Sequence, residues 1–368
     1  MQVKRALLRA GARAFRTDAT AFERCLHGVV PLSDRAVLRV SGEDRFELLQ
    51  GVVAQDMRPL EHGAVPASYT ALLMPNGRFG SDFFVCNSQE EQEGSLLLDV
   101  DRSDAGRLQR ALKMYALRRR VTVDDVSQEM RVWSLMSVDQ EGMQRCTAAA
   151  RQRGDVSFVD PRLAKLGARM LLSQQAIPKV PQVFQQVGED FYEALRVTQG
   201  VPTGGADLIR DKSMPLEAGL DWLNGIAFHK GCYVGQELTQ RVHTQGVVRK
   251  RFMPVRLVRA DKVDTHGNES VPNFEALPCA DSALFPNTLE PQDLLPADSA
   301  HSVLDVTLKG KKVGTLHSAI YNFAIARLRL RDALSQKRTE HLRVSLGDQE
   351  FVLVPQVPQW WLAHESGY

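Results

Sequence analysis

The sequence lacks the features of a membrane-spanning or disulfide-stapled protein. No run of about 18 apolar residues occurs, so we expect no membrane insertion. Its 5 cysteines are widely spread and form no C-x-x-C pair, which argues against a disulfide framework, a local zinc site and a dithiol redox motif. The net charge is only +2, so the composition gives no clear signal for a nucleic-acid partner. These absences favour a globular protein of a reducing compartment.

The N-terminus carries a local excess of positive charge. Five basic residues precede the first acid, Asp18: Lys4, Arg5, Arg9, Arg13 and Arg16. On a helix the four arginines share one face, opposite small and apolar residues. This pattern is typical of a mitochondrial presequence, so we expect residues 1–25 to be one, with cleavage near residues 17–30 and a location in the matrix. A basic helix or tail without a targeting role is the alternative.

Residues 26–250 predict an α/β domain. A strand is followed by a helix with Ser41 as its N-cap, and a turn at Pro75-Asn76-Gly77 predicts a hairpin. Leu108 and Leu112 mark the buried stripe of a further helix. Later strands at residues 131–138 and 168–173, with a helix around residues 191–198, form a second α/β portion. The strands expected in the first portion span residues 36–40, 68–74, 79–86, 95–100 and 121–123.

Residues 251–368 predict a compact β-rich module with little helix. Residues 259–301 interrupt it with 5 prolines and many Asp, Ser and Asn residues, a composition that predicts an irregular, mobile insertion. The strands expected in this module span residues 252–258, 302–308, 313–321, 324–330 and 343–354.

The stretch "KGCYVGQE", residues 230–237, places Cys232 between two glycines. The glycines free the backbone for a tight loop, and the polar residues that follow predict a helix starting near Tyr233. Cys232 would then lie at the positive end of that helix and near Lys230 in sequence, which favours the thiolate. Cys232 is therefore a candidate nucleophile or ligand of a soft metal.

Residue types alone leave other interpretations of Cys232 open. An isolated cysteine is usually a small apolar residue in a loop, and spacing does not separate a nucleophile from a ligand. A single cysteine cannot hold an iron–sulfur cluster, because such clusters commonly need four protein ligands. A partner would have to supply the others. His229 and His243 could add ligands, although lone histidines beside aromatic or apolar residues are more often structural.

The octapeptide resembles the signature of the YgfZ branch of the folate-binding aminomethyltransferase-like superfamily, which includes mitochondrial iron–sulfur cluster assembly factors. The resemblance covers roughly residues 31–330, apart from the proline-rich segment, and the octapeptide is its specific part. Supporting passages follow in the same order: "VSGEDRFELLQGVVAQD", "ALLMPNGRFGSDFFV", "MYALRRRVTVDD", "RVTQGVPTGGADL", "MPLEAGLD" and "KKVGTLHSA".

The resemblance implies an α+β fold of ferredoxin-like mixed sheets with helices, a C-terminal β-barrel and a tetrahydrofolate-type pocket. It also implies that Cys232 serves the maturation of iron–sulfur proteins beside an A-type carrier, as the functional thiolate and a ligand of a shared cluster. We expect these residues to surround the pocket: Asp82, Arg196, Glu217, Lys230, Tyr233, Gln236, Glu237 and Arg241.

Two departures from the aminomethyltransferase pattern bear on chemistry. That enzyme resembles this chain near residues 80–82 but has an acidic pair there, where this chain has Ser81 and Asp82. It also has an acid where this chain has Thr198, a weaker neutral partner for a pterin ring. The resemblance, taken with these departures, favours an accessory factor for iron–sulfur cluster assembly that is noncatalytic or only weakly catalytic. The alternatives are a folate-dependent one-carbon transferase and a binding protein that keeps only the fold.

Overall fold

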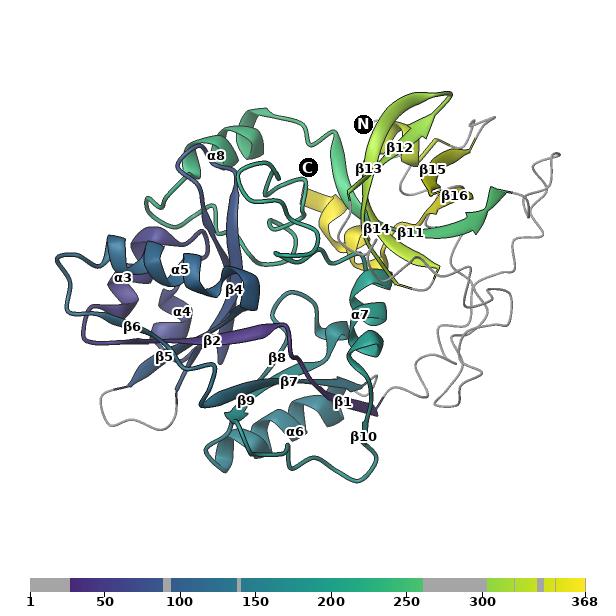
Figure 1. The fold of residues 1–368 in the computed structure, drawn as a ribbon. Helices are drawn as coiled ribbons and strands as arrows, with labels where there is room; N and C mark the ends of the chain where they lie inside the picture. Colours follow the sequence, from purple (N-terminus) through teal and green to yellow (C-terminus); the bar gives the residue numbers. More distant parts are fainter. Residues whose placement is uncertain are drawn as a thin grey trace. The chain divides into compact units, whose positions relative to one another are not determined.

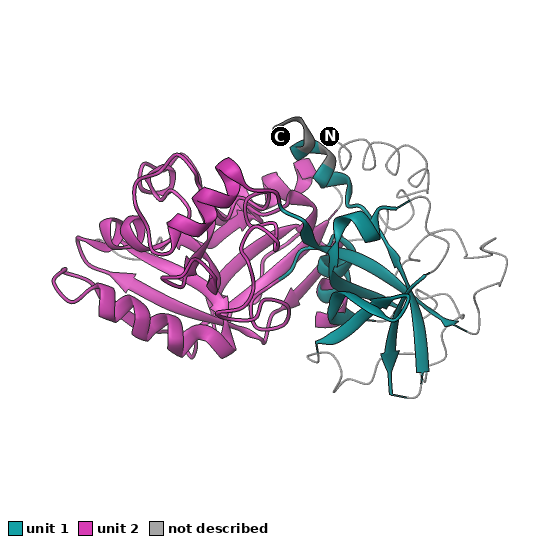
Figure 2. Ribbon diagram, turned by 90° about the horizontal axis from the view of Figure 1, so that it is seen from above, with its two compact units in different colours: residues 1–26, 193–202, 248–368 teal, residues 27–192, 203–247 magenta. Residues whose placement is uncertain are grey.

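The computed structural model describes residues 27–88, 94–137, 140–260, 303–320, 322–335, 341–347 and 349–367. The predicted presequence lies outside these residues, as does nearly all of the predicted insertion. The chain forms two compact units (Figure 2). The larger unit lies within residues 27–192 and 203–247, and the described part of the smaller unit lies within residues 193–202, 248–260 and 303–367, apart from the gaps given above.

The first sheet of the larger unit confirms the first predicted α/β portion. Its strand order is β3-β4-β5-β2-β6, and all its pairings are antiparallel. The predicted hairpin is β3 with β4. The strands are β2 (Arg35–Ser41), β3 (Ala67–Leu73), β4 (Phe79–Asn87), β5 (Ser95–Asp101) and β6 (Thr122–Asp125).

Three helices accompany this sheet: α3 (Arg45–Val52), α4 (Arg58–Glu61) and α5 (Arg102–Tyr115) (Figure 1). Apolar residues of α3 and α5 pack with β2 and β5 in one buried cluster that includes Leu48, Leu98 and Leu108. The predicted N-cap of α3 was wrong. The helix begins after Asp44, not Ser41, because Gly42 adopts a positive φ of 111° and delays the first helical turn.

The second sheet of the larger unit has the order β10-β1-β7-β9-β8. Four elements of this portion were not predicted from the sequence: α6 (Gln140–Gln152), which packs against β7 and β8, the inner strand β1, and the edge strands β8 and β10. All five residues of β1 pair with β7, so cleavage within β1 would remove part of the sheet. The strands are β1 (His27–Pro31), β7 (Met130–Ser137), β8 (Val156–Val159), β9 (Ala168–Ser173) and β10 (Gln185–Gln186).

Three further elements complete the larger unit or join it to the smaller one. A single 3-10 turn, η1 (Ala164–Leu166), precedes β9, and α8 (Gln236–Gln245) follows the long turn-rich segment after residue 203. The predicted helix near residue 191 is α7 (Glu189–Thr198), which passes along the chain from one unit to the other. It ends, as expected, before Gly200, whose φ is 68°.

The smaller unit is a closed barrel with the strand order β11-β14-β13-β12-β15-β16. The single strand predicted at residues 343–354 was wrong, because a turn with Gly347 at φ 58° divides it into β15 and β16. A short helix, α9 (Leu330–Ala333), follows β14, and η5 (Gln359–Gly367) buries Trp361. The strands are β11 (Lys250–Arg259), β12 (Leu304–Leu308), β13 (Lys311–Ile320), β14 (Phe323–Arg329), β15 (Leu342–Leu346) and β16 (Gln349–Pro355).

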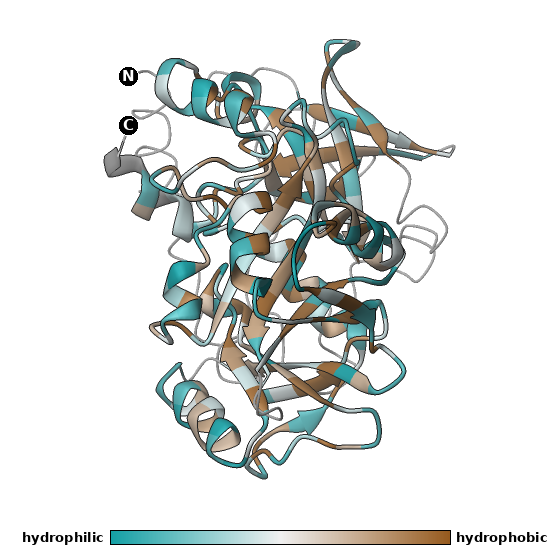
Figure 3. Cartoon of the chain, turned by 90° about the vertical axis from the view of Figure 1, so that its left-hand side faces the viewer, coloured by the Kyte–Doolittle hydropathy of each residue, from teal (hydrophilic) through white to brown (hydrophobic). Residues whose placement is uncertain are grey.

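The antiparallel sheet, the mixed sheet, their helices and the barrel confirm the predicted α+β class. Apolar residues concentrate along the strands, whereas many surface helices and loops are hydrophilic (Figure 3). Within the described residues, no helix has both the length and the apolar character needed to cross a membrane.

Candidate functional site

The cysteine that the sequence singles out lies on the surface of the larger unit. We call residues 228–235, which precede α8, the Cys232 loop. Cys232 is exposed, whereas the two other described cysteines, Cys86 and Cys146, are buried. Burial raises the pKa of both buried thiols, which keeps them protonated and unreactive. Among the described cysteines, Cys232 is therefore the one that a second molecule can reach.

An open pocket of about 590 Å³ adjoins the thiol. Cys232 and its neighbours line one side, and polar side chains from successive turns of α8 line the other. The spacing of four residues places Gln236, Gln240 and Thr244 along one helical row and Glu237, Arg241 and Gln245 along the next. The lining residues are Phe228, Lys230, Gly231, Cys232, Gln236, Glu237, Gln240, Arg241, Thr244 and Gln245.

Lys230 fixes the start of the exposed segment. Its ammonium donates hydrogen bonds to the backbone carbonyls of Gln50 at 2.8 Å, Val53 at 2.6 Å and Gln55 at 3.0 Å. It also lies 5.3 Å from the centre of the Tyr233 ring. Burial lowers the pKa of Lys230 to about 8, because the charged form loses hydration.

Gly235 fixes the end of the loop against the β3–β4 turn. Its φ is 77°, and a Cβ added there would lie 2.3 Å from the carbonyl oxygen of Met74. Gly77 in the facing turn is equally constrained, since its added Cβ would lie 2.5 Å from the Cβ of Leu238. Gly231 differs, because an added Cβ would meet no atom within 4 Å. The second glycine of the octapeptide is required by close backbone packing, and the first is not.

Tyr233 and Gln236 join the loop to α8. The backbone amide of Tyr233 donates to Oε1 of Gln236 at 3.2 Å, and its buried hydroxyl lies 3.1 Å from Oγ1 of Thr239. Burial raises the pKa of Tyr233. These two predicted ligand-binding residues therefore hold the loop in place, and Gln236 also lines the pocket.

The predicted start of the helix at Tyr233 was wrong. α8 begins at Gln236, with Gly235 as its N-cap, because the left-handed Gly235 is incompatible with an earlier helical turn. Cys232 thus lies three residues before the N-cap and outside the first turn, where the effect of the helix dipole is concentrated.

Glu237 and Arg241 are exposed on α8 and line the pocket. Their spacing of four residues allows an ion pair, but the described ion pairs do not include one between them. Both side chains therefore remain directed to the surface, where a bound molecule can contact them.

The two histidines near the loop have different surroundings. His229 is exposed, whereas His243 stacks on Phe228 with ring centres 3.6 Å apart, as expected for a structural histidine. Within the described ranges, no cluster of three or more His, Cys, Asp or Glu side chains is arranged to hold a metal ion. Cys232 is thus a single exposed thiol outside any such cluster.

Asp82, a predicted pocket residue, lies in the interior of the larger unit. Its Oδ2 accepts a hydrogen bond from the Tyr69 hydroxyl at 2.8 Å, and its Oδ1 accepts one from the backbone amide of Gly204 at 2.9 Å. Burial raises the pKa of Asp82 despite the nearby charge of Arg35. Asp82 is only 3% exposed.

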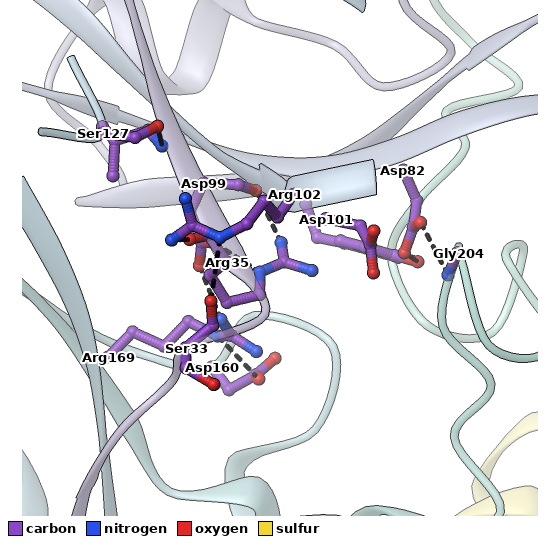
Figure 4. A network of polar contacts seen from close by, with 12 residues as sticks. Ser33, Arg35, Asp82, Asp99, Asp101, Arg102, Ser127, Asp160, Arg169 and Gly204 are labelled. Carbon is purple, nitrogen blue, oxygen red and sulfur yellow. Dashed lines mark hydrogen bonds and ion pairs between the residues drawn. The ribbon is translucent and has the colours of Figure 1, made fainter. Parts of the chain in front are cut away.

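Asp82 belongs to a set of buried charges and tyrosines whose other members were not predicted from the sequence. Asp99 accepts from Nε of Arg35 at 2.6 Å and from Nη1 of Arg169 at 2.5 Å (Figure 4). Arg169 also donates to the Tyr192 hydroxyl at 2.6 Å. We call this set the buried polar network; its members are Arg35, Tyr69, Asp82, Asp99, Asp160, Arg162, Arg169 and Tyr192.

The arginines of the network also pack on aromatic rings. The guanidinium of Arg169 lies 4.1 Å from the ring centre of Phe84, and that of Arg162 lies 4.8 Å from it. Burial acts to raise the pKa of Asp160, but the charges of Arg162 and Arg169 outweigh it and lower that pKa. A sequence signal was present, because a charge inside an apolar strand, such as Asp99 in "SLLLDVD", has to be paired when buried.

The other predicted pocket residues have partners of their own. In the smaller unit, Arg196 donates to the carbonyl of Val201 at 2.7 Å and to Oγ of Ser318 at 3.1 Å. Thr198 donates to the carbonyl of Ala194 at 2.8 Å in its own helix. Glu217 is half-buried in a turn-rich segment of the larger unit.

These contacts bear on the fit of a tetrahydrofolate-type ligand. Each oxygen of Asp82 already accepts one hydrogen bond from the protein, and a Cβ at Gly204 would lie 2.3 Å from Oδ1, so the protein fills the space beside that oxygen. The hydroxyl proton of Thr198 is donated within its own helix. A pterin ring would therefore have to share Asp82 with Tyr69 and Gly204.

Comparison with known proteins agrees with this architecture. The family described as "CAF17, C-terminal beta-barrel domain" matches residues 249–363. Aminomethyltransferase T of the glycine cleavage system from Bartonella henselae has a similar fold, with a TM-score of 0.61 at 12% identity over 97% of this chain and 89% of that one. The expected fold is thereby confirmed.

Two curated relatives resemble nearly the whole chain. The mitochondrial iron–sulfur cluster assembly factor IBA57 of Homo sapiens is 33% identical over 342 residues, which cover 90% of this chain and 84% of the relative. The mitochondrial IBA57 homologue of Mycosarcoma maydis is 31% identical over 347 residues, which cover 89% and 83%. The chain therefore belongs to the IBA57 family of mitochondrial iron–sulfur cluster assembly factors.

Proposed function

We propose that the chain acts in mitochondrial iron–sulfur cluster assembly by holding or transferring a bridging cluster through Cys232. The observation that carries the proposal is an exposed thiol beside an open pocket, on a loop held at both ends. The cluster is cargo, shared with an A-type carrier protein and destined for proteins that contain four-iron clusters.

The chemistry of the thiol supports a shared cluster. The thiolate is the form of cysteine that binds iron, so binding releases the Cys232 proton to solvent and forms one iron–sulfur bond. That thiolate displaces one thiolate of the carrier from an iron, the displaced thiolate takes up a proton from solvent, and the oxidation state of the metal does not change. Iron–sulfur clusters commonly need four protein ligands. One thiolate from this chain therefore requires the carrier to provide the remaining ligands.

The pocket beside Cys232 supports docking of a partner at the same face. Glu237 and Arg241 present opposite charges there, and three glutamines present both hydrogen-bond donors and acceptors. Such mixed polar groups suit the rim of a protein–protein interface, which is polar and carries hydrogen bonds between the partners. The carrier would contact α8 while its cluster reaches the thiol.

A folate-dependent transferase has less support. Asp82, the remaining acid of the aminomethyltransferase pattern, is bonded to Tyr69 and Gly204 in the interior. We therefore expect no turnover of an aminomethyl donor in the presence of tetrahydrofolate. A fluorescence titration with tetrahydrofolate tests binding separately from turnover.

The proposed function is tested by anaerobic mixing of the full chain with an A-type carrier loaded with a two-iron cluster. We expect a coloured complex of the two proteins that survives size-exclusion chromatography and carries iron and sulfide in equal amounts. The Cys232→Ser variant should not form it. The matched control is Cys146→Ala, which removes a buried thiol elsewhere and should form the complex as the wild type does.

Two outcomes would contradict the proposal. The first is a Cys232→Ser variant that forms the same coloured complex in the same yield. The second is a Cys232→Ser variant that fully restores aconitase activity in cells that lack the wild-type protein. Either result would favour a binding protein that keeps the fold without the thiol chemistry.

A further inference from the structure

The carbonyl end of α3 offers three acceptors where the Cys232 loop begins. The carbonyl of Gln50 lies in the last turn of α3, and its usual partner would be the amide of Ala54. That amide instead donates to the carbonyl of Ala71 in β3 at 2.9 Å. Val53 is the C-cap of α3, and Gln55 lies two residues after it. The Lys230 ammonium donates to the carbonyls of all three residues.

We infer that Lys230 is a positioning residue, which holds the Cys232 thiol in place by capping the carbonyl end of α3. This inference rests on the proposed role of Cys232. It gives Lys230 a part different from the ligand-binding one expected from the sequence.

The hydrogen-bond inventory of Lys230 supports a positioning role. An ammonium group has three protons, and the three carbonyls use all of them. Negative partial charge at the end of a helix also favours a cation there. No proton of Lys230 is left for a ligand in the pocket, so its influence on bound cargo passes through the backbone of the loop.

The second fixed point follows the thiol by three residues. Gly235 packs on the β3–β4 turn, and the buried Tyr233 side chain lies between the two fixed points. Between them, Gly231 and Cys232 are exposed. The thiol thus lies on the exposed part of a short loop that is hydrogen-bonded at one end to carbonyls at and after the end of α3 and packs at the other end against the β3–β4 hairpin.

A fixed loop matters because a docking partner needs the thiol in one place. If the start of the loop is released, the thiol samples many positions, and only a fraction of molecules can bind the cluster at any moment. The apparent affinity then falls in proportion to that fraction.

Lys230→Met tests the inference, because methionine keeps the apolar stem and removes all three donors. The matched control is Lys212→Met, which changes an exposed lysine of the same unit. Hydrogen exchange of the peptide covering residues 230–236 should become about tenfold faster in Lys230→Met only, and the affinity for the cluster-loaded carrier should fall about tenfold, in line with the competent fraction. Lys230→Arg keeps donors for the carbonyls. This variant should therefore restore most of the slow hydrogen exchange and most of the affinity for the loaded carrier.

The outcomes separate this inference from the proposed function. One outcome is that Lys230→Met shows the wild-type rate of hydrogen exchange and the wild-type affinity for the loaded carrier, while Cys232→Ser does not bind the loaded carrier. In that case the inference is wrong and the proposed function stands. If Cys232→Ser still binds, the proposed function is wrong whatever Lys230 does. Should circular dichroism show Lys230→Met to be unfolded, Lys230→Gln takes its place, and wild-type exchange and binding in that variant overturn the inference.

Discussion

The Cys232 loop and the buried polar network carry reactive residue types in opposite settings. In the network, carboxylates and guanidiniums bond to each other inside the larger unit, and Asp99 is inaccessible to solvent. In the loop, the charged Lys230 is used in structural bonds and the thiol is exposed. The difference shows that accessibility, and not the presence of charged side chains, distinguishes the site that can act on another molecule.

The comparison also explains why the two regions should respond differently to mutation. A buried charge that loses its partner remains in a medium that solvates it poorly, so the whole unit loses stability. An exposed thiol has no such partner, and its replacement should change function without changing stability. Each prediction below tests one side of this difference.

The largest expected effect is on the network. Asp99→Asn removes the negative charge that Arg35 and Arg169 share, and it should lower the free energy of unfolding by about 3–5 kcal/mol. Urea denaturation followed by tryptophan fluorescence measures the change. Cys232→Ser, in the same assay, should stay within about 0.5 kcal/mol of the wild type. Equal losses in the two variants would remove the distinction between the regions.

A smaller effect is expected within the loop itself. Gly235→Ala requires a positive φ and brings a Cβ against the carbonyl of Met74, so it should cost on the order of 1–3 kcal/mol. Gly231→Ala meets no atom within 4 Å and should cost less than about 0.5 kcal/mol. Thermal unfolding of the two variants makes the comparison. Similar melting temperatures would mean that the hairpin does not hold the loop.

The smallest effect is a change in the pH dependence of stability through Asp82. Burial raises the pKa of Asp82 above its usual value of 3.8, so the folded protein binds this proton more tightly than the unfolded chain. This contribution to stability is complete below the unfolded pKa and is lost as the pH rises through the folded pKa. Asp82→Asn stays neutral, and its amide can bond to both Tyr69 and Gly204.

Relative to the wild type, Asp82→Asn should therefore become more stable as the pH rises above 3.8. Urea midpoints of both proteins at several pH values from about 4 to about 8 measure the difference. A difference that stays constant across this range would contradict a raised pKa for Asp82.

The sequence predicted the elements that local signals determine. The turn at Pro75-Asn76-Gly77 identified its hairpin, and the buried stripe of α5 was evident from Leu108 and Leu112. The start of α8 was predicted wrongly because it depends on Gly235 packing against a hairpin more than 150 residues earlier in the chain. No local pattern reports such a contact.

The network was missed for the same physical reason. Arg35 and Asp99 are 64 residues apart in sequence, and Arg169 and Asp99 are 70 apart. Their charges occur in apolar strands, which indicates pairing but not the partner. For Cys232, the sequence identified the residue, and the structure added the exposure, the pocket and the two fixed points around it.

The most direct test of the central claim is the alkylation rate of Cys232, measured anaerobically by mass spectrometry of its peptide. Iodoacetamide is added to the full chain alone, with the carrier lacking a cluster, and with the carrier holding one. We predict rapid labelling in the first two mixtures and strong protection in the third, because the iron–sulfur bond occupies the thiolate. Equal labelling with the empty and the loaded carrier would contradict the claim that this thiol binds the shared cluster.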